Sequence, residues 1–187
     1  MVDQEKVERA CRLLLEGIGE DPSREGLLET PARVARMYAE LCSGMDSDAS
    51  EHLSRTFPVT SNDIVIERDI PFFSLCEHHL LPFFGTAAIG YVPDGRVAGL
   101  SKLARTVETF SRRLQLQEQL TAQIADALME HLAPRGAIVY LEAEHLCMTI
   151  RGVKKPGAKT ATCARRGVFA DDPALEERFF RMLGARA

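Results

Sequence analysis

The stretch AIVYLEAEHLCMTIRGV, residues 137–153, is predicted to form one long β-strand that carries reactive and apolar side chains in alternation. Side chains alternate between the two faces of a strand, so every second residue shares a face. The reactive face would carry His145, Cys147, Thr149 and Arg151. The opposite face would carry Leu146, Met148 and Ile150. Burying apolar side chains does not require this sorting, so the reactive face is a candidate for a chemical site.

Helical and extended patterns alternate on both sides of this strand. Strand patterns with bounding Pro and Gly are DIVIERDIPFFSL at 63–75, GTAAIGYVP at 85–93 and TATCA at 160–164. Helical periodicity occurs at 4–17, 30–43, 101–114, 115–132 and after Pro173, and 45–62 looks like a polar connector. The order predicts an α+β fold with a mostly antiparallel sheet. We expect an N-terminal helical region (1–62) and a sheet-bearing region (63–187) that form one functional domain.

Composition excludes several classes of protein. A chain of 187 residues is long enough for one domain with a real core, and its net charge of −4 favours neither nucleic acid nor an anionic membrane. The N-terminus MVDQEKVERA lacks the apolar stretch of a signal peptide, and no apolar run is long enough to span a bilayer. Five scattered cysteines, an odd number, argue for a reducing compartment. We therefore expect a cytoplasmic protein.

A second reactive stretch, SLCEHHLLPF at 74–83, supplies the other half of a candidate metal site. Cys76 and His79 have a Cys-x-x-His spacing, and Cys147 would complete three ligands. Three protein ligands with an open fourth position are typical of catalytic zinc. Buried cysteines are often small hydrophobic side chains without a metal, which is the simpler interpretation of either segment alone. The two segments together, with His78 and His145 left as proton carriers, favour zinc.

Basic residues near two predicted helix starts indicate an anionic ligand. Lys102 and Arg105 are three residues apart, hence on one helical face, and Arg33 and Arg36 repeat that spacing. Helix N-termini offer free N–H groups and a positive dipole end, which suit phosphate. Each of these side chains alone is more simply a solvated charge. Their placement, with Arg151 beside the proposed metal, favours a polyphosphate.

The segment LQLQEQLT, residues 114–121, contains a candidate reader of a heterocycle. Glu118 can accept two parallel hydrogen bonds from a guanine N–H and amino group, with Gln117 beside it. An exposed helical glutamate is the alternative that the pattern alone favours.

Five segments of the chain together resemble the GTP cyclohydrolase I family. They are EDPSREGLLETPARVARMY, CEHHLLPFFG, GLSKLAR, LQEQLT and EHLCMTIRGV, in order from about residue 20 to 169. The resemblance implies the tunnelling fold, in which a four-stranded antiparallel sheet carries two packed helices, here with added N-terminal helices. In that family the sheets of several subunits join into a barrel. The implied assembly is a homodecamer of two stacked pentamers with active sites at subunit interfaces.

The resemblance also implies an activity and a role for each candidate residue. The family hydrolyses GTP to formate and 7,8-dihydroneopterin triphosphate, the first step toward folate and pterins, and zinc provides an activated water. The implied zinc ligands are Cys76, His79 and Cys147. The implied catalytic residues are His78 and His145 for proton transfer and Ser101 near the ribose. The implied substrate-binding residues are Glu118 and Gln117 for guanine, with Lys102, Arg105, Arg151 and a neighbouring subunit's Arg33 or Arg36 for triphosphate.

Two other hypotheses stay open from the sequence. A protein of the same fold could carry different chemistry, as a zinc-dependent pterin synthase or a deazapurine nitrile reductase with a nucleophilic cysteine. The combination of Cys-x-x-His with His-x-Cys favours the cyclohydrolase over both. A non-catalytic, zinc-stabilised oligomeric binding module is the third hypothesis. It leaves His78, His145 and the basic residues without roles, and it predicts a closed zinc site and no formate release.

Overall fold

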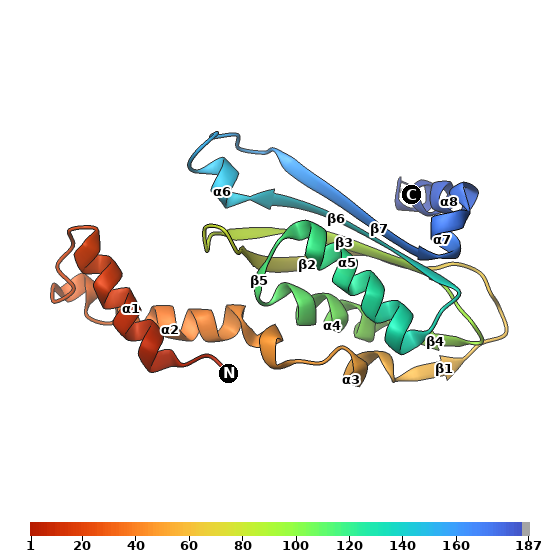
Figure 1. The fold of residues 1–187 in the computed structure, drawn as a ribbon, viewed down its shortest axis with the longest axis horizontal. Coiled ribbons are helices and arrows are strands. Elements are labelled where there is room, and N and C mark those ends of the chain that lie inside the picture. Colours follow the sequence, from red (N-terminus) through yellow and green to blue (C-terminus); the bar gives the residue numbers. More distant parts are fainter. Residues whose placement is uncertain (185–187) are drawn as a thin grey trace.

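A mixed but mainly antiparallel sheet forms the centre of the computed structural model, which describes residues 1–184 (Figure 1). Its strand order is β5-β2-β3-β6-β7, and every pair is antiparallel except β5 with β2. The strands are β2 (Val65–Cys76), β3 (Pro82–Val92), β5 (Leu114–Gln115), β6 (Gly136–His145) and β7 (Lys159–Gly167). A separate pair joins β1 (Thr56–Pro58) to β4 (Arg96–Ala98).

Strand register brings the two reactive segments to the same end of the sheet. Phe83, near the start of β3, pairs with Ser74 near the end of β2 and with His145 at the end of β6. The chain therefore leaves β2 at Cys76 and leaves β6 at His145 next to the same strand. Residues separated by about seventy positions in the sequence are neighbours because of this pairing.

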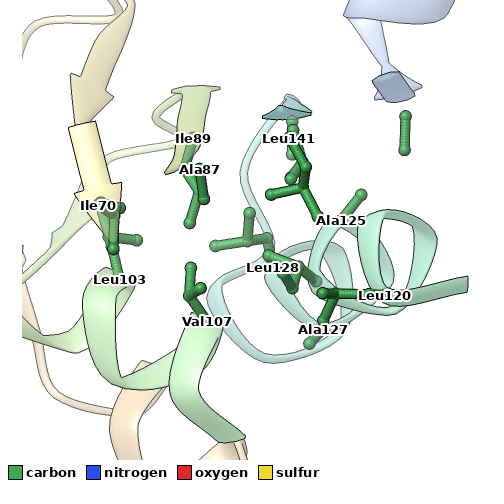
Figure 2. Close-up of a cluster of buried hydrophobic side chains, with 14 of the residues drawn as sticks. Ile70, Ala87, Ile89, Leu103, Val107, Leu120, Ala125, Ala127, Leu128 and Leu141 are labelled. Atoms are coloured by element: carbon green, nitrogen blue, oxygen red, sulfur yellow. The ribbon is translucent and has the colours of Figure 1, made fainter. Parts of the chain in front are cut away.

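Two helices, α4 (Leu100–Ser111) and α5 (Gln117–Ala127), lie along one face of the sheet (Figure 1). A short π-helical segment, η3 (Leu128–Leu132), extends α5. Figure 2 shows the core between these helices and the sheet, to which Leu103 and Val107 of α4, Leu120 of α5, and Ile89 and Leu141 of the strands contribute. All five of these side chains are fully buried. Burial of this apolar face is the main force that holds the helices on the sheet.

Helical segments also lie outside this main layer. On the opposite face, α7 (Val168–Asp171) and α8 (Pro173–Gly184) bury Phe169 and Phe179 against Ile138. At the end of the sheet that carries the reactive segments, a hairpin of α1 (Gln4–Gly17) and α2 (Thr30–Leu41) extends away from the body (Figure 1). The short segment η1 (Glu25–Leu27) lies between α1 and α2 in the chain, whereas η2 (Ser43–Asp46) and α3 (Ser50–Leu53) follow α2 and pack against α4. Within residues 1–184, no helix is both long and apolar enough to cross a bilayer.

The α+β class and the antiparallel sheet with two packed helices are confirmed, whereas several local expectations are wrong. The strand expected at 137–153 ends at His145, and a four-residue helix, α6 (Leu146–Thr149), follows it. Residues 114–115, expected in a helix, form the short β5, which adds a fifth, parallel strand to the four expected. The connector expected at 45–62 contains η2, α3 and β1.

Candidate active site

A tight turn between β2 and β3 places Cys76 and His79 on one side of the chain. The amide of Leu80 donates to the carbonyl of Cys76 at 2.8 Å, and the amide of Cys76 donates to the carbonyl of Leu81 at 2.9 Å. Leu80 closes the turn with a φ of 56°, in the left-handed region that non-glycine residues seldom adopt. Such backbone conformations cost free energy and cluster at functional sites.

Cys147 approaches this turn from α6, and the three residues form a group that fits a metal ion. One ligand atom from each of Cys76, His79 and Cys147 lies within 4.8 Å of the others, and Cys76 Sγ is 4.0 Å from His79 Nδ1. Tetrahedral zinc with ordinary bond lengths would set that sulfur–nitrogen distance at about 3.6 Å. Side-chain adjustments of less than an ångström would therefore close this pair around zinc.

The route by which Cys147 reaches the group differs from the strand alternation expected. Because β6 ends at His145, residues after it turn as a helix, and Thr149 donates to the carboxylate of Glu144 at 2.8 Å.

Burial and the neighbouring Cys76 raise the pKa of the Cys147 thiol. A bound cation would reverse this by favouring the thiolate, which is the form that ligates metal.

The Arg151 side chain contacts the metal group through His79. Its Nη1 lies 3.0 Å from His79 Nε2, on the side of the ring opposite the nitrogen that faces Cys76. A guanidinium can only donate, so in this contact Nε2 accepts and Nδ1 carries the proton. Metal ligation through Nδ1 requires the other tautomer, in which Nε2 carries the proton. The Arg151 contact and metal ligation by Nδ1 are therefore mutually exclusive.

The two remaining histidines differ in their surroundings. His145 is half-buried and stacks on Phe83, with ring centroids 4.5 Å apart and planes within 2°. Its pKa is lowered by burial, an effect that the charge of Glu118 partly offsets. His78 is exposed and lies edge-on to His79, with ring centroids 6.2 Å apart. His145 is thus held neutral in a fixed plane, whereas His78 is open to solvent.

Gln117, at the start of α5, joins His145 to the sheet. Its side chain is 2% exposed, and its Oε1 lies 2.7 Å from His145 Nε2. Its amide nitrogen faces three acceptors, which are the carbonyls of Leu141 and Thr160 and the hydroxyl of Thr162. Sequence reasoning placed Gln117 beside guanine and did not identify Phe83, Thr121 or Thr162 as part of the site. Only three-dimensional packing brings these residues to His145, so no local motif marks them.

The residues expected to bind substrate lie on separate surfaces of the chain. Ser101 and Arg105 are exposed on the first turns of α4, with the half-buried Lys102 between them. Arg105 lines a cavity of about 450 Å³ beside η2 and α3, and Glu118 lines another of about 590 Å³ against β7. Neither cavity is lined by a residue of the metal group.

The arginines of α2 belong to a third surface. Arg33 pairs with Glu29 at 2.7 Å, and both side chains are largely exposed. Arg36 is exposed on the same helix. The structure therefore brings together the metal group, Arg151, His78 and, through the pairing of β3 with β6, His145, but it does not gather the remaining substrate-binding residues around them within one chain.

The family model and the curated relatives that match this chain give the same result. A family model described as GTP cyclohydrolase I matches residues 7–184. A protein of Clostridium perfringens named GTP cyclohydrolase 1 is 57% identical over 183 residues, which are 98% of this chain and 99% of that protein. One of Carboxydothermus hydrogenoformans with the same name is 58% identical over 185 residues, 98% of this chain and 96% of the relative. Among solved structures, an archaeosine synthase QueF-Like in the apo form matches with a TM-score of 0.49 and 17% identity, over 58% of this chain and 97% of its own.

Proposed function

The chain belongs to the GTP cyclohydrolase I family and is a hydrolase of that kind, and we propose that it converts GTP to formate and 7,8-dihydroneopterin triphosphate at a zinc centre of Cys76, His79 and Cys147. The single observation that carries the zinc centre is the convergence of these three ligand atoms within 4.8 Å. Two sulfurs and one imidazole leave a fourth position open, as in catalytic zinc sites.

Zinc would supply a Lewis acid that activates water for hydrolysis of the guanine imidazole ring. The protein's own groups would move the protons. His145, with its pKa lowered by burial, is suited to accept a proton, and the exposed His78 is placed on the same turn as the ligands to donate one to a ring nitrogen. Ser101 is proposed to assist the later rearrangement of the ribose.

Recognition of GTP is proposed to rest on charged residues that assembly of subunits would bring to one site with the metal group. Lys102, Arg105 and Arg151 would hold the triphosphate, which is not cleaved, and Glu118 would accept hydrogen bonds from guanine. Contacts to a part of the substrate that does not react contribute orientation, so their loss should reduce turnover as well as binding. The amide of Gln117 already has partners on both sides, which favours a role for this residue behind His145.

Assembly into a homodecamer of two pentamers is proposed because several surfaces need a partner. β7 is an edge strand of the sheet, and its free backbone groups can pair with another chain. The helical hairpin exposes large apolar side chains, among them Leu14, Ile18 and Met37, which are 64%, 67% and 45% exposed. A neighbouring subunit would also bring its Arg33 or Arg36 to the triphosphate. A cytoplasmic location is proposed from the five free cysteines.

Incubation of zinc-loaded protein with GTP tests the proposed reaction. Release of formate together with the absorbance band of a pterin is the expected result. Formate without a pterin would place the defect after ring opening, at Ser101 or the substrate contacts. Neither product from fully zinc-loaded protein would refute the proposal, and it would favour a non-catalytic zinc module or another purine or pterin substrate.

A further inference from the structure

The hydrogen-bond network behind His145 defines which nitrogen of that ring carries its proton. The side-chain amide of Gln117 faces His145, and the hydrogen-bond partners of this amide show which end is nitrogen and which is oxygen. The carbonyl oxygens of Leu141 and Thr160 lie 3.3 Å and 3.0 Å from one end of this amide. Carbonyl oxygens only accept hydrogen bonds, so the group that faces them is the NH₂. The oxygen Oε1 therefore faces His145.

Two threonine hydroxyls reinforce this orientation. Thr121 donates its single hydrogen to the backbone carbonyl of Gln117 at 2.7 Å. The hydroxyls of Thr121 and Thr162 are 2.6 Å apart, and since the hydrogen of Thr121 is used, Thr162 is the donor of that pair. Thr162 can then only accept from the Gln117 amide nitrogen, 3.1 Å away. The direction of both threonine hydroxyl bonds and the orientation of the Gln117 amide are therefore determined, while the two hydrogens of its NH₂ serve three acceptors.

The tautomer of His145 follows directly. Oε1 of Gln117 is an acceptor 2.7 Å from His145 Nε2, so Nε2 carries the hydrogen. In the neutral ring the other nitrogen, Nδ1, then has a free lone pair. The stack on Phe83 fixes the ring plane, so the lone pair has a fixed direction as well.

We propose that Gln117 is a positioning residue, which holds His145 as the Nε2–H tautomer and so makes Nδ1 the proton acceptor at the start of the reaction. This inference rests on the proposed cyclohydrolase function, because it assigns a direction to one of its proton transfers. Water, the co-substrate of hydrolysis, loses a proton to Nδ1 while its oxygen forms the new bond to C8 of guanine. The π bond between C8 and the ring nitrogen breaks, its electron pair moves to that nitrogen, and the nitrogen takes a proton from His78. The resulting imidazolium keeps its Nε2–H bond to Gln117 and can return the Nδ1 proton later. In this order His145 accepts before it donates.

The tautomer can be measured without turnover. Zinc-free protein labelled with ¹⁵N-histidine, studied by magic-angle-spinning NMR at pH 8, gives separate signals for protonated and unprotonated ring nitrogens. The chain has five histidines, and a His145→Asn variant identifies the signals of His145. We expect an unprotonated Nδ1 and a protonated Nε2. A protonated Nδ1 in the unaltered protein would overturn the proposal, whatever the variants do.

Two variants separate positioning from simple packing. Gln117→Met keeps the length of the side chain but removes the acceptor, and the ratio of the two tautomers should shift by about tenfold, as expected for one buried hydrogen bond. Thr162→Val removes one partner of the network but leaves both carbonyls that orient the amide, so the Nε2–H form should persist. An equal shift in both variants, or no shift in Gln117→Met, would contradict the proposal.

Kinetics with GTP then connect the tautomer to catalysis. Gln117→Met should lower kcat by about 10²-fold and change KM by less than about threefold, because the loss falls on proton transfer. A rise in KM with kcat unchanged would instead make Gln117 a guanine contact. If the unaltered protein releases no formate, the proposed cyclohydrolase function is refuted. The NMR experiment needs no turnover, so it tests the tautomer of His145 independently, and the two failures are distinguishable.

Discussion

The metal group and the substrate-binding residues are held in different ways by the same chain. Cys76, His79 and Cys147 are within reach of one ion, and His145 is fixed by the Gln117 network and the Phe83 ring. Apart from Arg151, the charged residues expected to bind GTP lie instead on α2, α4 and the start of α5, and Arg105 and Glu118 line two separate cavities.

This difference follows from the forces that place each group. Pairing of β2 with β3 and of β3 with β6 fixes the positions of the metal group to within a side-chain rotation. Arginines and lysines on helix surfaces gain little from packing in one chain and are kept in water by their charge. We therefore expect that one chain suffices to bind zinc, whereas GTP binding needs neighbouring subunits.

The largest expected effect is that of removing one zinc ligand. Cys147→Ser should lose bound zinc and lower formate release by at least about 10³-fold, because a Lewis acid contributes several kcal/mol to such a reaction. Zinc content by atomic emission and formate release measure the two effects. Cys163→Ser, which alters an exposed cysteine outside the metal group, should keep one zinc per chain. Full zinc content in Cys147→Ser would show that the metal is bound elsewhere.

A smaller effect is expected from removing one substrate contact. Arg105→Ala should lower kcat/KM by about 10²-fold, the loss expected for a charge-assisted contact to phosphate, with zinc content unchanged. Steady-state kinetics and metal analysis on the same preparation give both values. Loss of zinc together with activity in Arg105→Ala would show that the metal group and the substrate-binding residues are not independent.

The smallest effect concerns Arg151, where the two groups of residues meet. The contact of Arg151 with His79 requires the His79 tautomer that cannot ligate zinc through Nδ1. Removal of this contact in Arg151→Gln should therefore tighten zinc binding by about tenfold. This factor is the lower end of the effects seen for groups that contact a metal ligand. Competition with a chelator measures the affinity. Lys102→Gln removes the same charge without touching His79 and serves as the control. If zinc affinity rose equally in both variants, loss of a positive charge would explain the change without the His79 tautomer. Weaker zinc binding in Arg151→Gln would contradict the tautomer argument.

The grouping of Cys76, His79 and Cys147 could be predicted from the sequence because its signal is local. Cys76 and His79 lie on one short turn, and Cys147 lies in a segment rich in reactive residues. The geometry of the second segment is predicted wrongly, since the expected strand at 137–153 extends eight residues beyond the real end of β6. Cys147 still reaches the metal group, because the helical turn after His145 begins beside the same strand end.

The network behind His145 could not be predicted in this way. Gln117, Thr121 and Thr162 come from α5 and β7, and their side chains meet only after the helix packs on the sheet. β5 was missed for a related reason, since a two-residue strand has no periodicity and exists only through its pairing with the end of β2. Long-range pairing, which leaves no local pattern, accounts for both failures.

Complementation between two inactive variants tests the central claim most directly. Cys147→Ser lacks a proposed zinc ligand, and a chain with both Arg33→Ala and Arg36→Ala lacks the arginines that are expected to act on a neighbour's site. Co-expressed with different tags and purified as mixed assemblies, they should regain about a quarter of full activity, because about a quarter of the sites receive one intact half from each chain. Mixed assemblies as inactive as either parent, or a fully active arginine variant, would show that the site is not shared between subunits.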